Sequence, residues 1–221
     1  MIRKPMRSTL VVTTAATDLT LLTVEERREA AGLDAGDASK DATLLALDQR
    51  VAAAIASECN IAIGNGGEPT LKKETLTETF YSVYLDRLLL ARRHNADITS
   101  LTDGDTALTA TDYIVDPEAG IVTRMRSDCP SAWRSSKIVV VYEAGFETIP
   151  GDLKFAAMDF LKSLWLAKSR DPFLKSDRTE VTDIMVQQQE YWIGAIPGQQ
   201  NDGAVPEVIA GSLKRFRNYR V

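Results

Sequence analysis

Residues 137–171 read KIVVVYEAGFETIPGDLKFAAMDFLKSLWLAKSRD and contain the change from strand to helix on which the fold depends. The uninterrupted apolar run Ile138–Val141 predicts a strand that is buried on both faces or nearly so. Gly145 and then Pro150-Gly151 end this strand, because glycine and proline do not extend a ladder. Asp152 can cap the N–H groups that follow, so we predict a helix from about Asp152 to Lys168.

One face of this predicted helix is apolar and belongs in a core, whereas the opposite arc is polar except for Phe155 and Leu166. Two large apolar side chains in a polar arc are costly to expose. We predict that Phe155 and Leu166 form a subunit interface. The alternative is that the chain's own last helix, expected from about Thr179 to Trp192, covers them.

The N-terminal third has its own helix signals. An extended, β-prone arm over residues 8–22 leads to Thr23-Val24-Glu25-Glu26, in which threonine and the glutamate three positions later form a capping box. The first helix is expected to stop at Gly32. A second amphipathic helix follows, with apolar residues recurring at helical spacing through about Asn60: Leu44, Leu47, Val51, Ile55 and Cys59.

Beyond the turn at Gly64–Gly67 the pattern becomes that of short antiparallel strands. The candidates are Leu85–Arg93, Asp97–Leu101, Asp112–Val115 and Ile121–Met125, with Tyr113 and Trp133 in their core. We therefore predict an α+β fold: a small α-helical bundle with an inserted antiparallel β subdomain and an extended C-terminal arm. The expected units are residues 1–66 (arm and two helices), 67–150 (inserted β-rich subdomain), 151–193 (central and last bundle helices) and 194–221 (linker and C-terminal arm).

Four segments of the sequence, taken in their order along the chain, resemble those of a known protein family. They are STLVVTTAATDLTLLTVEERREAAGLD, GDASKDATLLALDQRVAAAIASECN, TDGDTALTATDYIVDPEAGIVTRMRSDCPSAW and VVYEAGFETIPGDLKFAAMDFLKSLWLAKSRD. Together they resemble the head–tail connector (adaptor, or head-completion) proteins of long-tailed bacteriophages and related prophages. The last segment is similar to the family's V-x-Y-x-A-G-[FY] motif followed by I-P and a long helix.

This resemblance implies a structural protein of the virion neck, assembled in the host cytoplasm. Identical subunits, typically twelve in the family, would form a ring that docks on the portal protein, contacts a downstream neck or tail-completion protein, and continues the DNA channel. Genomic DNA would pass through the lumen without sequence recognition. The resemblance implies no cofactor and no catalytic turnover.

The C-terminal segment is basic and aromatic, and it follows a linker rich in glycine, proline and glutamine. Its apolar residues have no evident place in the compact domain, so we predict a free arm that binds a partner. The resemblance implies that this partner is the portal. The expected docking residues are Leu213, Arg215, Phe216, Arg217, Tyr219 and Arg220.

Composition and isolated motifs bound the other functions. The 221 residues carry a formal net charge of -5, which argues against a general nucleic-acid binder. Cys59 and Cys129 are far apart in sequence and are expected to be free thiols in a soluble protein made in the cytoplasm, with no contact to a membrane. His94 has no partner in a catalytic motif, and Asp103 and Asp105 fit a hairpin turn better than a metal site. A small α+β enzyme or nucleic-acid-binding module remains the alternative function.

Overall fold

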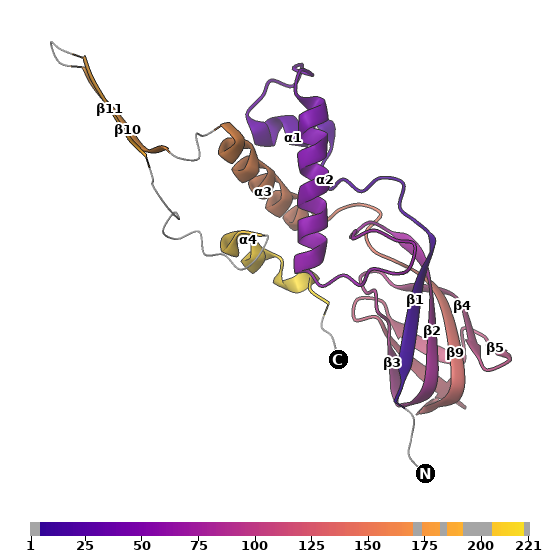
Figure 1. Ribbon diagram of the computed structural model, residues 1–221. Coiled ribbons are helices and arrows are strands. Elements are labelled where there is room, and N and C mark those ends of the chain that lie inside the picture. The colour runs from indigo at the N-terminus through magenta and orange to yellow at the C-terminus, as the bar shows by residue number, and fades with distance from the viewer. Residues whose placement is uncertain (1–4, 170–173, 182–184, 192–204, 219–221) are drawn as a thin grey trace.

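The computed structural model describes residues 5–169, 174–181, 185–191 and 205–218. The helices gather at one end of the molecule and strands β1–β9 at the other, whereas β10 and β11 lie beyond the helical end. Helix α2 runs along the helical end towards the sheets (Figure 1). In chain order the elements are β1 (Arg7–Thr14), α1 (Val24–Ala31), α2 (Asp41–Glu58), β2 (Glu74–Leu85), β3 (Arg87–Leu89), β4 (Asp97–Asp103), β5 (Thr106–Leu108), β6 (Tyr113–Asp116), β7 (Ile121–Arg126), β8 (Cys129–Ser131), β9 (Trp133–Ala144), α3 (Gly151–Ser169), β10 (Leu174–Val181), β11 (Met185–Tyr191), α4 (Glu207–Ser212) and a 3-10 turn, η1 (Lys214–Phe216).

Helix α1 begins and ends as its sequence predicts. The Thr23 hydroxyl accepts a hydrogen bond from the Glu26 backbone N–H, and the Glu26 carboxylate accepts one from the Thr23 N–H, which completes the capping box. Gly32 closes the helix in the left-handed conformation, with φ of 70°. The apolar face predicted for α2 is also confirmed, since Leu44, Val51 and Ile55 are buried.

Strands β1–β9 form two antiparallel sheets that share one core. The larger sheet has the order β1-β2-β9-β4-β5, and the smaller one has the order β3-β7-β6 with β8 also paired to β7. Trp133 lies fully buried in the shared core and Tyr113 packs against it, as predicted. In β9 the buried Ile138, Val140 and Tyr142 alternate with half-buried Val139 and Val141, so only one face of the strand is fully enclosed.

The predicted extended, β-prone arm over residues 8–22 contributes strand β1, which pairs with β2 along the edge of the larger sheet. One predicted helix differs from the structure. The predicted last helix from about Thr179 to Trp192 is wrong, because β10 and β11 form an antiparallel pair there. The β-branched residues Thr179, Val181 and Val186 favour strands, and this preference prevails over an apolar spacing that also fits a helix.

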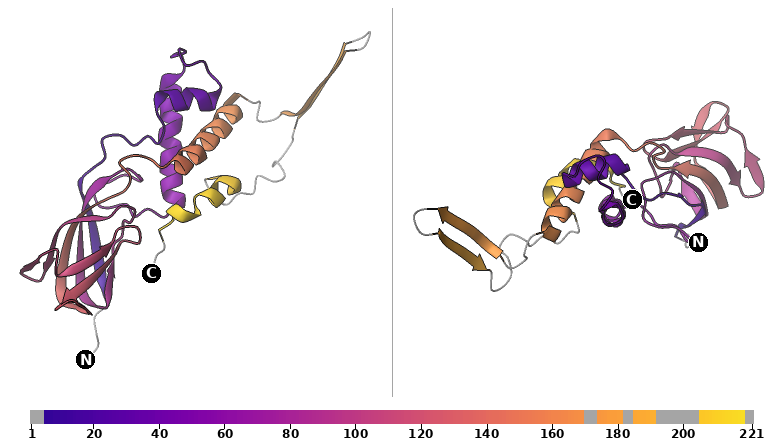
Figure 2. Two further views of the ribbon diagram at one scale, coloured as in Figure 1. Left: turned by 180° about the vertical axis from the view of Figure 1, so that it is seen from behind. Right: turned by 90° about the horizontal axis from the view of Figure 1, so that it is seen from above.

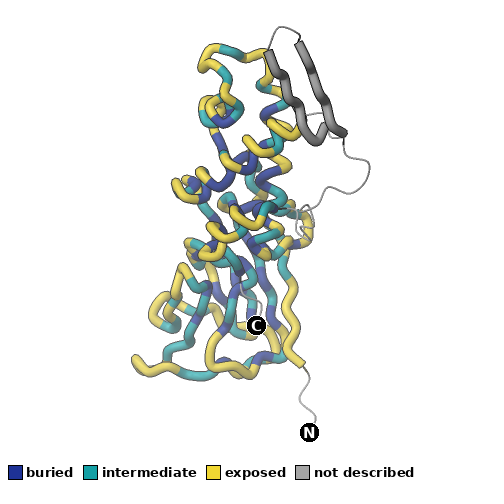
Figure 3. Tube along the Cα trace, turned by 90° about the vertical axis from the view of Figure 1, so that its left-hand side faces the viewer, coloured by how far each residue is buried: buried dark blue, intermediate teal, exposed yellow. Residues whose placement is uncertain are grey.

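Burial divides the molecule into two cores, one among the helices and one between the sheets (Figure 3). Charged side chains join them. The Arg92 guanidinium, whose side chain is 2% exposed, donates to Ala62 O (2.7 Å), Thr70 O (3.0 Å) and the Glu74 carboxylate (2.7 Å). Beside it, the Tyr142 hydroxyl accepts a hydrogen bond from the Arg92 backbone N–H and donates to the Glu78 carboxylate.

The strand-to-helix joint also connects the two parts of the molecule, which the views from behind and from above show (Figure 2). Gly145 has φ of 110°, and its N–H donates to His94 O at 2.8 Å. A Cβ atom at this position would lie 2.3 Å from the Lys72 carbonyl oxygen. Phe146 then donates to Leu71 O and accepts from Lys73 N–H, so the chain passes between backbone groups before α3 begins. Only glycine fits this crossing.

We predict that Gly145→Ala lowers the free energy of unfolding by about 2–3 kcal/mol, since the added methyl group meets a backbone carbonyl and the positive φ is strained. Urea unfolding measures this loss. Gly104→Ala is the matched control, because Gly104 has φ of 63° but no heavy atom within 4 Å of the place that a Cβ would take. The control should lose only about 1 kcal/mol. Equal losses in the two variants would show that the contact with Lys72 is unimportant.

A second prediction concerns pH. Burial raises the pKa of Glu78 from 4.5 to about 7. The folded protein therefore holds this proton more tightly than the unfolded chain, so the stability contribution is present below pH 4.5 and is lost as the pH rises through 7. The loss is about 3 kcal/mol, since one pH unit is worth ~1.4 kcal/mol.

Glu78→Gln removes this titration and keeps an acceptor for the Ala91 N–H and the Tyr142 hydroxyl. The difference in unfolding free energy between wild type and Glu78→Gln should shift against wild type between pH 4.5 and 8. Taking this difference cancels the titration of Asp48 and His94, which both variants share. A difference that does not change with pH would contradict the prediction.

Candidate interaction surfaces

The described C-terminal segment, residues 205–218, packs into the helical core. Its buried side chains belong to the same cluster as those of α2 and α3, and they are Val205, Ile209, Leu213 and Phe216. The expectation that Leu213 and Phe216 lack a place in the compact domain is therefore wrong. The spacing of these buried residues along α4 and η1 places their side chains on the face that packs against the helical core. The linker before them gave no indication of this packing.

Polar contacts fix the end of this segment against the loop between the two cores. The Asn218 backbone N–H donates to Cys59 O at 2.7 Å, and its side-chain amide donates to Ala91 O at 3.2 Å. In return the Arg93 guanidinium donates to the Asn218 side-chain oxygen at 3.0 Å and to Arg217 O at 2.6 Å. The segment thus connects the end of α2 to the residues that precede β4.

His94 belongs to this junction. Its Nε2 lies 2.9 Å from Phe216 O, which as a carbonyl accepts the hydrogen bond, and its ring stacks on Phe146 with centroids 5.4 Å apart. Burial lowers the pKa of His94. With these contacts the half-buried imidazole has its hydrogen bond satisfied and holds the C-terminal segment in place. A structural role of this kind agrees with the absence of a catalytic motif around His94 in the sequence.

The basic residues predicted to dock have different surroundings. Arg215 is exposed, lies 2.9 Å from Asp152 and stacks over the Phe216 ring, whereas Arg217 pairs with Glu58. Tyr219 and Arg220 lie outside the described residues. A pocket of about 390 Å³ opens here and is lined by Arg93, His94, Asn95, Glu118, Phe146, Arg215, Phe216 and Arg217. Its charge suits an acidic side chain.

The outer face of α3 carries the two predicted interface residues. Phe155 is 67% exposed and Leu166 is 53% exposed, on the side of the helix away from the buried Leu153 and Leu161. The alternative cover, a last helix of the same chain, is removed by the β10–β11 pair. Asp159 and Lys162 share this outer face and are exposed.

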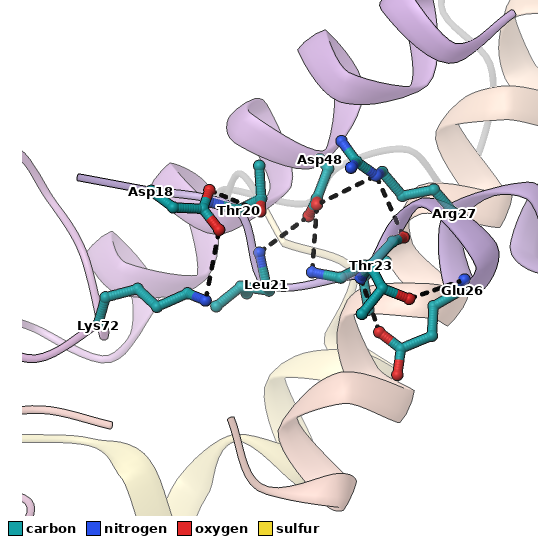
Figure 4. A network of polar contacts seen from close by, with 9 residues as sticks. Asp18, Thr20, Leu21, Thr23, Glu26, Arg27, Asp48 and Lys72 are labelled. Atoms are coloured by element: carbon teal, nitrogen blue, oxygen red, sulfur yellow. Dashed lines mark hydrogen bonds and ion pairs between the residues drawn. The ribbon is translucent and has the colours of Figure 1, made fainter. Parts of the chain in front are cut away.

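A network of polar contacts holds the entrance to α1 (Figure 4). The fully buried Asp48 of α2 accepts hydrogen bonds from the Leu21 and Leu22 N–H groups at 3.3 and 3.2 Å. Burial raises the pKa of Asp48 to about 6, although these hydrogen bonds lower it. Arg27 lies 3.9 Å from Asp48 and donates to Thr23 O, but its Nη1 is buried without a hydrogen-bond partner.

Beside this network lies a pocket of about 170 Å³, which we call the α1–α2 pocket. Its lining is mostly apolar and consists of Val24, Arg27, Asp41, Ala42, Leu44 and Leu45. Sequence reasoning missed it, because the two groups of residues are separated by a loop and meet only when α1 folds across α2. The signal available was an arginine on the inward side of a capped helix.

The far end of the β part has a second basic pocket, of about 330 Å³. Arg124, Arg126 and Arg134 line it with a single carboxylate, that of Asp103, which pairs with Arg124. Arg124 stacks over Trp133, and its Nε is buried without a hydrogen-bond partner. The Asp103-Gly104-Asp105 turn joins β4 to β5, as predicted for a hairpin.

A metal site, a disulfide and a membrane-spanning helix each have requirements that the described residues do not meet. No group of three or more His, Cys, Asp or Glu side chains there could hold a metal ion. Cys59 is buried and Cys129 is exposed, and both are free thiols. Within the described part of the chain, no helix is long and apolar enough to span a bilayer.

Leu213→Ala tests whether the C-terminal segment belongs to the core. Leu213 is fully buried, so we predict a loss of about 2–5 kcal/mol in unfolding free energy. Val208, on the same short helix, is 89% exposed, and Val208→Ala should change the stability by less than about 0.5 kcal/mol. Thermal and urea unfolding of both variants give the comparison. If the two variants were equally stable, residues 205–218 would be a free arm after all.

Comparison with known proteins gives matches in structure alone, since no protein-family model and no curated protein sequence matches the chain. One similar structure is a chain from the neck of an empty GTA (gene transfer agent) particle, computed with C6 symmetry. It is 20% identical with a TM-score of 0.56, and the match covers 96% of this chain and 97% of that one.

A second similar structure is a chain from the neck of a native GTA particle, computed with C12 symmetry. It is 17% identical with a TM-score of 0.50, and the match again covers 96% and 97% of the two chains. At these identities the likeness concerns the fold. Over 96% of its length, the chain therefore shares the fold of these two GTA neck chains.

Proposed function

We propose that this protein is a structural subunit of the neck of a phage-like particle, where copies of it form a ring between the DNA-filled head and the tail. The observation that carries the proposal is the likeness over 96% of the chain to chains from two GTA necks. Both necks were computed with cyclic symmetry, C6 and C12. A cyclic ring needs two different faces on each subunit, one for each neighbour.

In this role the protein works by shape and charge and not by turnover. The portal protein would lie on the head side of the ring, and a downstream neck or tail-completion protein on the tail side. Genomic DNA would pass through the lumen without sequence recognition. A subunit with a formal net charge of -5 suits such passage, because its overall field does not hold the phosphate backbone.

For portal docking we propose that only some of the predicted residues of the C-terminal segment contact the portal. Leu213 and Phe216 stabilise the segment from inside, so they position the docking face and do not reach the partner. Arg215 supplies an exposed charge, and Arg217, Tyr219 and Arg220 complete the group. One such contact per subunit is weak, but repetition around a ring multiplies it and makes attachment sensitive to salt.

For the ring itself we propose that Phe155 and Leu166 contact the neighbouring subunit. Burying one such side chain contributes roughly 1.5–3 kcal/mol. The double variant Phe155→Ser, Leu166→Ser should therefore be a folded monomer under conditions in which wild type forms a closed ring. Negative-stain imaging and light scattering report the assembly, and circular dichroism reports the fold.

Ile114→Ser is the control, since Ile114 is 57% exposed on β6 in the β part of the molecule. It should leave the ring intact. An annulus in the wild-type images, alone or with portal, is the result that the proposed function requires. Wild-type protein that stays monomeric even with portal would argue against it.

A further inference from the structure

The α1–α2 pocket has the size and lining to receive an aromatic ring. Its volume is about 170 Å³, and cavities of roughly 150 Å³ with apolar walls hold a benzene molecule. Val24 and Leu45 at its rim are 38% and 40% exposed, which leaves apolar surface in contact with water. Nothing in the described part of the chain fills this space.

One residue that lines the pocket, Arg27, also has an unsatisfied hydrogen-bond donor. Arg27 is 9% exposed, and its Nη1 is buried without a hydrogen-bond partner, whereas its Nε already donates to Thr23 O. A buried charged donor without an acceptor is unfavourable. Arg27 also lines the pocket, so a carboxylate brought in with an apolar side chain would satisfy this donor once the guanidinium turned towards it.

The α1–α2 pocket and the flank of α2 next to the C-terminal part of α3 face different directions. The α1–α2 pocket uses Leu45, whereas the flank of α2 that adjoins Trp165 and Lys168 of α3 carries Thr43 and Leu47. Leu45 and Leu47 point in nearly opposite directions, because two residues turn a helix by about 200°. Phe155 in turn faces away from the core on α3. Phe155 of the same chain is 67% exposed and does not line the pocket, so the pocket stays open to a neighbour in a ring.

Charge favours the same pairing. The exposed Asp159 follows Phe155 by one helical turn on the outer face of α3. The pocket offers the unpartnered Arg27 donor, and the pocket's own carboxylate, Asp41, is already paired with Arg28 at 2.5 Å. An aromatic ring with an adjacent carboxylate matches an apolar pocket with a buried guanidinium.

We infer that Phe155 of one subunit inserts into the α1–α2 pocket of the next subunit, where Asp159 accepts a hydrogen bond from Arg27. The occupant of the pocket is thus a second copy of this chain. The inference rests on the proposed ring and names the contact that closes it. Because the two faces differ, each subunit gives Phe155 to one neighbour and receives it from the other.

Two variants, each with one face blocked, test this arrangement. Phe155→Ser removes the inserted side chain but keeps the pocket, and Ala42→Trp fills the pocket but keeps Phe155. Ala42 is exposed and lines both this pocket and the hollow beside Lys168, so a larger side chain there does not enter the core. Ser57→Trp, at the other end of α2, is the control for an added exposed tryptophan and should still form the wild-type ring.

Each blocked variant alone is expected to be a folded monomer of 24.3 kDa. An equimolar mixture should give a dimer of twice that mass and nothing larger, because one Phe155 and one open pocket remain to pair. Mass photometry and analytical ultracentrifugation measure the masses, and unfolding midpoints verify the fold.

The outcomes separate this inference from the proposed function. If folded Ala42→Trp still formed rings like those of wild type, or if the mixture stayed monomeric, the inserted Phe155 contact would be wrong. The proposed function as a neck ring would not be affected. A wild-type protein that forms no ring, alone or with portal, would overturn both. If Ala42→Trp fails to fold, Leu45→Arg blocks the same pocket from its exposed rim and replaces it in the mixture.

Discussion

The buried guanidinium of Arg92 is the constraint on which the rest of the structure depends. A charge that is taken out of water must have its hydrogen bonds satisfied, and Arg92 finds its acceptors in the chain that leaves α2 and in the first residue of β2. These acceptors can meet at one point only if the helical part and the sheets hold a fixed relation. The residues that follow Arg92 then extend the same junction, since Arg93 and His94 hold the C-terminal segment.

The joint between β9 and α3 requires glycine at position 145, because backbone groups of other segments already crowd this part of the junction. The strand β9 must pass from the sheet core to the helices between the His94 carbonyl and the backbone at Lys72, which leaves no room for a side chain. Local sequence, backbone geometry and tertiary packing thus agree at one residue. Helix α3 starts from this fixed position, so the direction of its outer face is set by the sheet and not by the helices alone.

Elements with local signals could be predicted, whereas those set by distant partners could not. The capping box of α1 and the glycine and proline around α3 are local, and the structure confirms them. Strand β2 was missed because Glu74 and Glu78 occupy inward positions, so its alternation looks polar. Their burial depends on Arg92 and Tyr142, which are remote in sequence. The pairing of β10 with β11 and the packing of Leu213 are non-local in the same sense. The interaction surfaces follow this rule, since Phe155 stands out in sequence and the α1–α2 pocket does not.

In the ring that we propose, the angle at which subunits meet depends on how α1 packs against α2 and α3. Asp48 holds the entrance of α1 against α2 through two backbone N–H groups, and Glu26 holds its first turn to α3 through Lys154 at 2.7 Å. Lys154 is the immediate neighbour of Phe155. A few polar contacts therefore link the pocket side of a subunit to its protruding side. In the proposed cyclic assembly any error in this angle would be repeated at every interface, so these polar contacts would influence whether the ring closes as well as the stability of one chain.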